Sequence, residues 1–244
     1  MYTFGPIAAA ISAAHTVVTV LTDALTPTLG TASAAVAIVC LTVLVRLLVL
    51  PLNYLQVRGE KARARLAPQL AVLRERYGKK PEKLVEETRK LYAKEGTSPL
   101  AGCLPGLAQT PVFIALYGLF VTSSVGGEPN GLLAHRLAGV PLGSTLTQTL
   151  GGGSVGPVLV FAVLLALLAA GAWATRRWLT LPALAEGAAG GQQQLPGMGV
   201  VGYLPYTVLL VAFVAPLAAG VYLVTSTAWT VAERTTLRRI VPAG

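Results

Sequence analysis

The chain has 244 residues, of which 54% are hydrophobic and only 12% are charged, and its mean hydropathy is +0.65. Because an average soluble domain carries about a quarter charged residues, a water-soluble protein of this composition is close to excluded. The net charge of +9 does not indicate nucleic-acid binding, since 12 of the 19 Lys and Arg residues lie in residues 57–95, beside apolar stretches. Cys40 and Cys103 lie in apolar stretches and predict neither a disulfide framework nor a metal site. We expect no cofactor.

Apolar stretches predict an all-α membrane protein with five transmembrane helices. A bilayer core of about 30 Å needs roughly 20 apolar residues in a helix. The last two spans form one long apolar stretch, which Pro216 and the small residues after it divide by a turn. The predicted spans are residues 31–56, 99–123, 156–178, 199–215 and 217–233.

Positive charge predicts how these spans are oriented. Residues 57–95, the two arginines after the third span and the short basic tail 234–244 hold 17 of the 19 Lys and Arg residues. Since cytoplasmic loops are enriched in these residues, we expect the N-terminus outside and the C-terminus in the cytoplasm. Residues 124–155 are then an external loop, and residues 179–198 are a cytoplasmic loop with the composition of a flexible linker.

The segment before the first span predicts an amphipathic helix. Apolar residues recur in residues 1–30 at steps of four and three, with polar residues on the opposite face. We interpret this segment as a helix on the outer surface of the membrane, and the lack of Lys or Arg before it argues against a cleavable signal. A sixth span is the alternative. The apolar positions are Ile7, Ile11, Ala14, Val18, Leu21 and Leu25.

The charged segment 57–95 predicts a cytoplasmic hairpin of two helices. Good helix formers fill residues 58–77, Gly78 interrupts them, and Pro81 suits the start of a second helix. The apolar seam between the two helices is thin, so we expect the hairpin to be mobile. A solvated basic loop that only sets the orientation is the alternative. The seam residues are Leu66, Leu70, Leu73, Leu84, Val85 and Leu91.

Arg46 is the candidate functional residue because it lies near the middle of the first span. An arginine there costs about 2.5 to 3.5 kcal/mol on insertion scales, so such residues usually face a protein interior or a water-filled cavity. The predicted spans hold no Asp or Glu except Glu233 at the edge of the last one. We therefore expect Arg46 to face a wet cavity, and the alternative is a structural role in which carbonyls and hydroxyls hold it.

Other polar residues fall where they can line the same cavity. Thr42 and Asn53 lie one turn before and two turns after Arg46 on one helical face. Gln109 lies on the second span, and Tyr222 and Ser226 lie one turn apart on the fifth. For each of these residues a hydrogen bond between helices is the simpler interpretation.

Three segments closely resemble the YidC family of membrane protein insertases, within the Oxa/Alb/YidC superfamily. They are LTVLVRLLVLPL, LAPQLAVLRERYGKKPEKLVEETRKLYAKEG and SPLAGCLPGLAQTPVFIALYGLF, and a weaker likeness follows in PLAAGVYLVTSTAWTVAERTTLRR. The resemblance implies five spans around a hydrophilic groove with Arg46 at its centre. It also implies that Thr42 and Tyr222 line the groove, and that a substrate helix slides along Thr110 and Phe113.

The resemblance further implies an insertase and chaperone for nascent membrane proteins in the bacterial plasma membrane, not an enzyme. The Sec translocon and the ribosome are further expected partners besides the lipid bilayer, and no specific nucleic acid is expected. Leu223 and Thr227 depart from the aromatic residue and the Asn common in relatives. The short tail and the lack of a large outer domain fit a compact, Gram-positive-type form.

Two other classes of protein also use polar residues in membranes. A secondary transporter could bind an anionic solute at Arg46, but the chain shows no internal repeat of the kind that transporters display. An intramembrane protease needs a serine with a histidine base, and His15 and His135 lie outside the predicted spans. The glycine-rich segment 151–157 lacks the Lys-Ser/Thr ending of a phosphate loop.

Overall fold

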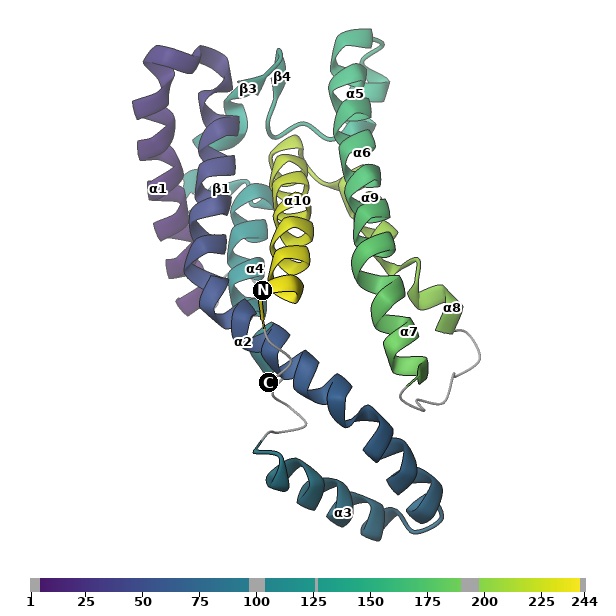
Figure 1. Ribbon diagram of the computed structural model, residues 1–244. Coiled ribbons are helices and arrows are strands. Elements are labelled where there is room, and N and C mark those ends of the chain that lie inside the picture. Colours follow the sequence, from purple (N-terminus) through teal and green to yellow (C-terminus); the bar gives the residue numbers. More distant parts are fainter. Residues whose placement is uncertain (1–4, 97–103, 126, 190–197, 242–244) are drawn as a thin grey trace. The chain divides into compact units, whose positions relative to one another are not determined.

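The computed structural model describes residues 5–96, 104–125, 127–189 and 198–241, and these residues are almost entirely helical (Figure 1). The all-α fold class is therefore confirmed. The longer helices are α1 (Gly5–Leu29), α2 (Ser33–Tyr77), α3 (Pro81–Lys94), α4 (Leu104–Val121), α6 (Val155–Thr175) and α10 (Leu217–Ile240). The shorter ones are α5 (Leu146–Gly151), α7 (Leu181–Ala189), α8 (Met198–Val201) and α9 (Thr207–Val214).

Short turns and strands connect these helices. Single helical turns are η1 (Gly30–Ala32), η2 (Gly131–Ala134) and η4 (Leu204–Tyr206), and η3 (Arg176–Thr180) is a π-helical turn. In the segment predicted as the external loop, β1 (Ser124–Val125) pairs antiparallel with β2 (Glu128–Pro129), and β3 (Arg136–Leu137) with β4 (Val140–Pro141).

Two helical stretches of the described residues are long and apolar enough to cross a membrane, Gly5–Tyr77 and Val155–Gly187. Val112–Val121 and Leu204–Val214 are shorter apolar helices. Because length and composition single out only two stretches among these residues, the number of five spans stays a prediction.

The chain forms two compact units. The first comprises Met1–Leu48, Thr110–Trp173 and Pro205–Thr230. The second comprises Val49–Gln109, Ala174–Leu204 and Val231–Gly244. Each unit is described below by itself.

The first unit has one apolar core, to which helix α1 contributes the face predicted from its sequence. Ile11 and Val18 are buried in this core, and four more residues of the face are partly buried against it: Ile7, Ala14, Leu21 and Leu25. The polar residues Ser12, Thr16 and Asp23 are exposed. Burial of the apolar stripe explains why this segment is an ordered helix.

Helices α6 and α10 approach each other closely in the first unit because glycines face the partner helix. A Cβ atom added to Gly220 would lie 2.6 Å from Leu164 Cδ1, and one added to Gly171 would lie 2.8 Å from Thr227 Cγ2. Small residues at such positions allow the backbones to pack closely, as in many membrane helix pairs.

The start of α10 is fixed by the segment before α5. Ala215 is extended and Pro216 follows it, which ends α9 and separates it from α10 as the sequence predicted. The first backbone N–H groups of a helix have no partner within it. Here the N–H groups of Leu217 and Ala218 donate to the carbonyls of Ser144 (2.9 Å) and Leu142 (2.8 Å).

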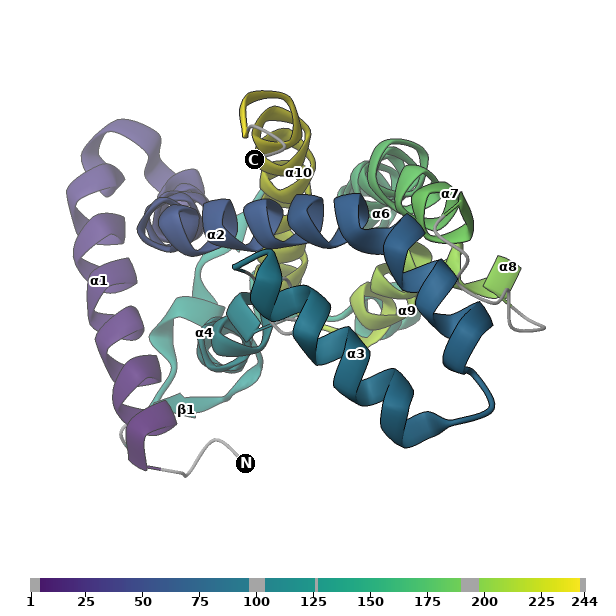
Figure 2. The ribbon, with the colours of Figure 1, turned by 60° about the horizontal axis from the view of Figure 1, so that its bottom comes forward.

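The second unit contains the helical hairpin. Figure 2 shows α3 running back along the C-terminal part of α2, which ends at Tyr77, and α3 begins at Pro81. Leu66 and Tyr92 are buried, but Val72 and Val85 are more than 60% exposed. Of the six predicted seam residues, only Leu66 is fully buried, four are partly buried and Val85 is exposed, so the seam is thin, as the sequence predicted.

Some boundaries differ from those expected. Helix α2 is continuous from the first predicted span into the hairpin, and Pro51 and Pro68 lie inside it. The predicted flexible linker from residue 179 is wrong in its first part, since Leu- and Ala-rich residues form α7 up to Ala189. The predicted tail from residue 234 is helical to Ile240, as part of α10.

Candidate functional site: an arginine cluster and a polar clasp

Arg46 and Ser226 meet in the first unit, where α2 and α10 lie side by side. The half-buried Arg46 donates through Nη2 to the hydroxyl of Ser226 and to its backbone carbonyl oxygen at 3.3 Å. Ser226 is buried. The alternative prediction for Arg46 was a structural role in which carbonyls and hydroxyls hold its side chain, and both of these contacts are of that kind. Both of these contacts from Arg46 are made to neutral groups of Ser226.

Tyr222 lies one turn before Ser226 and joins α10 to the aromatic residues of α4. Its ring centre lies 5.6 Å from that of Phe120 and 6.1 Å from that of Phe113. Phe113 also stacks on Tyr117, with ring centres 5.8 Å apart. Tyr222 is buried and hydrogen-bonds the side chain of Ser226, whereas Phe113 is 47% exposed. We call Arg46, Ser226, Tyr222 and Phe113 the arginine cluster.

The remaining predicted site residues lie in different surroundings. Thr42 is buried, and its hydroxyl donates to the Ile38 carbonyl at 2.7 Å, which satisfies it within its own helix. Thr110 is exposed on α4. The side chain of Gln109 lies outside the described residues.

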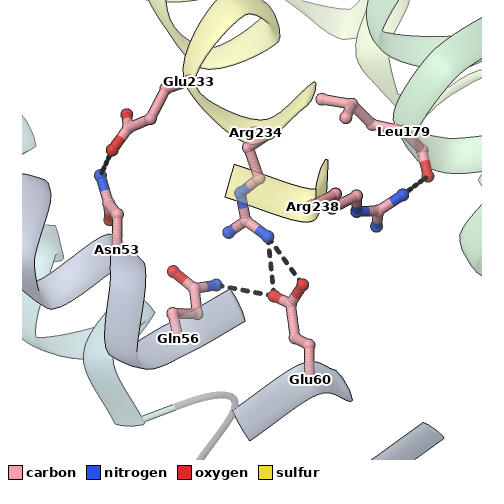
Figure 3. Close-up of polar contacts among 7 residues, drawn as sticks. All are labelled: Asn53, Gln56, Glu60, Leu179, Glu233, Arg234 and Arg238. Atoms are coloured by element: carbon pink, nitrogen blue, oxygen red, sulfur yellow. Dashed lines mark hydrogen bonds and ion pairs between the residues drawn. The ribbon is translucent and has the colours of Figure 1, made fainter. Parts of the chain in front are cut away.

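Asn53, predicted to share a polar face with Arg46, takes part in a second group of contacts in the second unit. Its amide Nδ2 donates to Glu233 Oε1 at 2.8 Å, and both side chains are buried (Figure 3). On the same two helices, Arg234 Nη1 donates to both carboxylate oxygens of Glu60, at 2.7 and 3.0 Å. Gln56 donates to Glu60 at 3.1 Å. We call these five residues of α2 and α10 the polar clasp.

The end of α10 is held by further contacts within the second unit. Lys61 donates through Nζ to the backbone carbonyls of Arg238 and Val241. A cation at this end of a helix satisfies carbonyls that have no partner within it and is favoured by the helix dipole. The guanidinium of Arg238 donates to the carbonyl of Leu179 at 3.5 Å.

The polar clasp was not foreseen from the sequence, which placed Glu233 at the edge of the last span. Asn53 and Glu60 are seven residues apart, which places them on one face of α2. Glu233 is the last residue of a predicted span, and Arg234 is the first residue of the predicted tail. That spacing was the available signal. It could not identify the partners, because the paired residues are separated by 180 and 174 positions in the chain.

The described residues hold no group of three or more His, Cys, Asp or Glu side chains that could bind a metal ion. The arginine cluster offers a cation, a hydroxyl, a phenol and aromatic surface. Such a set can attract an acidic group and contact an apolar chain.

Comparison with known proteins places the chain in a family. The sequence model described as "60Kd inner membrane protein" matches residues 25–243. The chain belongs to this family. The resemblance noted in the sequence is thereby confirmed, because many curated relatives are named as insertases of the YidC type.

Three relatives illustrate the similarity. "Membrane protein insertase YidC" of Streptomyces avermitilis is 33% identical over 157 residues, covering 59% of this chain and 37% of the relative. The protein of the same name from Oceanobacillus iheyensis is 44% identical over 85 residues, covering 33% and 34%. "ALBINO3-like protein 1, chloroplastic" of Arabidopsis thaliana is 41% identical over 127 residues, covering 52% and 25%. The aligned part therefore spans between 25% and 37% of the length of these relatives.

Proposed function

We propose that this member of the 60Kd inner membrane protein family is a membrane protein insertase and chaperone. The match over residues 25–243, together with relatives named as insertases, carries the proposal. The chain acts on nascent membrane proteins in a bilayer, without a cofactor and without making or breaking covalent bonds. The Sec translocon and the ribosome are proposed as further partners.

The proposed arrangement in the membrane follows from charge and hydropathy. Five spans cross the bilayer with the N-terminus outside, the hairpin and the C-terminus in the cytoplasm, and α1 on the outer surface. The hairpin makes the first contact with an incoming chain. In this arrangement the arginine cluster lies within the bilayer, in a groove that water enters from the cytoplasm.

The barrier that such a protein lowers is the passage of a polar segment through lipid. Each unsatisfied backbone group in the hydrocarbon core costs several kcal/mol. A wet groove shortens that passage, and the charge of Arg46 attracts acidic residues more strongly in a low-dielectric groove than in water. The hydroxyl and carbonyl of Ser226 accept hydrogen bonds from the guanidinium and orient it.

The substrate's apolar helix then leaves sideways into lipid, and its transfer to hydrocarbon is the driving force. The half-exposed Phe113, which stacks on Tyr117, provides apolar surface along this route, and Thr110 is exposed on the same helix. Release requires that the attraction to Arg46 be transient, because a permanent ion pair would trap the substrate.

The experiment is the insertion of a single-span protein with an acidic outer segment into vesicles that contain only this chain. We expect insertion with the native chain and with Arg46→Lys, and loss of insertion with Arg46→Ala. Two controls separate charge from structure. Arg46→Lys keeps the positive charge at this position, and Arg58→Ala removes an exposed arginine of the same helix, so both variants should insert.

Other outcomes contradict the proposal. Uptake of an anionic solute by these vesicles without any substrate protein would indicate a transporter. Equal insertion by Arg46→Ala, in a chain that folds normally, would assign Arg46 a structural role only.

A further inference from the structure

A groove in the second unit lies between the two hairpin helices and α7. It has a volume of about 840 Å³, and its lining comes from the C-terminal part of α2, from α3 and from Ala183, Glu186 and Gly187 of α7. Leu70, Leu84 and Val85 give it an apolar surface, and Val85 is 68% exposed. This groove is separate from the arginine cluster, and Glu60 is the one residue of the polar clasp in its described lining.

Positively charged side chains outnumber carboxylates in the lining of the groove. Arg63 and Arg74 of α2 and Arg89 of α3 line it with exposed side chains. Of its two carboxylates, Glu60 is engaged by Arg234 and Gln56, and Glu186 lies on α7. The two hairpin helices therefore present a positive field beside an apolar surface.

We propose that this groove binds an amphipathic helix of a partner protein, with the helix's apolar face on Leu70, Leu84 and Val85 and its acidic side chains beside the three arginines. Helices docked in apolar grooves are a recurring mode of recognition, and complementary charge speeds the encounter and selects the partner. Arginine is also enriched in protein interfaces. The proposal does not depend on the insertase function.

A helix fits this groove better than an anionic lipid surface does. A bilayer surface is flat and meets the outermost side chains, whereas this groove is concave and its apolar residues lie within it. A helix is about 10–12 Å wide with its side chains, so its apolar side chains can enter the groove while the backbone stays outside.

The test is binding of a designed peptide to the full-length chain in nanodiscs of neutral lipid, followed by fluorescence anisotropy. The probe is an 18-residue amphipathic helix with leucines on one face and glutamates beside them. A second peptide has the same apolar face with lysine in place of each glutamate. We expect the acidic peptide to bind at least about tenfold more tightly than the basic one.

Matched variants locate the binding site. The triple variant Arg63→Glu, Arg74→Glu and Arg89→Glu should weaken binding of the acidic peptide about tenfold or more. The control triple changes Arg58, Arg76 and Lys79 to glutamate, which alters the net charge equally at residues outside the groove. Val85→Asp, inside the groove, should also weaken binding of the acidic peptide. Its control is Val72→Asp, which changes a similarly exposed valine outside this groove and should leave binding unchanged.

Three results would overturn the proposal: equal binding of the basic peptide, equal weakening by the control triple, or loss of peptide binding in nanodiscs that contain anionic lipid. The last would indicate that lipid headgroups cover the hairpin arginines. All these variants change exposed side chains, and helicity by circular dichroism checks that each one folds. Because no insertion is measured, this proposal and the insertase function can fail separately.

Discussion

Asn53 on α2 donates a hydrogen bond of 2.8 Å from its side-chain amide to the carboxylate of Glu233 on α10, and both side chains are buried. Hydrogen bonds to a charged group contribute about 1.5–3 kcal/mol, more than those between neutral groups. This pair therefore makes a specific contribution to holding α10 on α2 within the second unit.

A double-mutant cycle measures that contribution. Asn53→Ala should lower the free energy of unfolding by about 1–3 kcal/mol. The cycle of Asn53→Ala with Glu233→Ala should give a coupling energy of about 0.5–3 kcal/mol. Thermal unfolding of the purified protein in detergent provides the values. Strictly additive effects would show that the two residues stabilise the fold independently.

The ion pair between Glu60 and Arg234 should contribute more to the free energy of unfolding than the ion pairs of α3 do. Glu60 and Arg234 are 33% and 23% exposed, whereas Lys90 and Glu86 are 61% and 63% exposed. Exposed pairs contribute little because water and salt screen them. Glu60→Gln should lower the free energy of unfolding by about 1 kcal/mol, and the matched Glu86→Gln should leave it unchanged. Equal effects would contradict this ranking.

The hydrogen bond from Lys90 lowers the pKa of Glu86, and the bonds to Glu86 and Glu87 raise the pKa of Lys90. A carboxylate with a lowered pKa stabilises the folded state above its unfolded pKa, and this stabilisation is lost as the pH falls through the folded pKa. Since both groups of this pair are exposed, loss of the pair on acidification should reduce the helicity of α3 only slightly. Circular dichroism at low and at high salt checks this, because salt should mimic the effect of acid.

The close approach of α6 and α10 predicts a rescue by a single methyl group. Gly171→Ala would place a Cβ 2.8 Å from Thr227 Cγ2, which is too close for unchanged packing, and should cost about 1–3 kcal/mol. Thr227→Ser deletes that Cγ2 methyl, so the double variant should regain most of the lost stability. Gly156→Ala is the control, because no heavy atom lies within 4 Å of its added Cβ. If the double variant does not regain stability, contact with the Thr227 methyl group is not the cause of the loss.

The thin seam of the hairpin predicts local opening. Leu66 is fully buried, so Leu66→Ala removes one of few buried apolar contacts there. Amide hydrogen exchange should speed up in residues 81–94 and stay unchanged in the first unit. Val72→Ala changes a side chain that is 61% exposed and should have no such effect. Exchange that rises equally in both units would mean that the hairpin unfolds only with the whole protein.

Local signals in the sequence were sufficient to predict most helices and some of their ends. The hairpin turn between Tyr77 and Pro81 and the break at Pro216 coincide with residues that interrupt helices by their own backbone chemistry. The packed face of α1 follows from its apolar spacing. Arg46 and Ser226 were each expected near one cavity, but the sequence left open whether Arg46 would contact a hydroxyl or face water.

Contacts between distant segments were beyond such signals. Nothing near Asn53 identifies Glu233 as its partner, and nothing near Lys61 indicates that it would cap the end of α10. The helix α7 was missed because glycines and glutamines after Ala189 gave the whole segment the composition of a linker. These features depend on which helices pack together, and a linear pattern does not contain that information.

The central claim is that the charge of Arg46 attracts acidic residues of a substrate, and a charge exchange tests it most directly. Arg46→Glu is combined with a single-span substrate whose acidic residues are all replaced by lysine, and insertion into vesicles is measured for the four pairings of chain and substrate. We predict that the native chain prefers the acidic substrate and that Arg46→Glu prefers the basic one. The same preference for the acidic substrate in both chains, with both folded, would contradict the account.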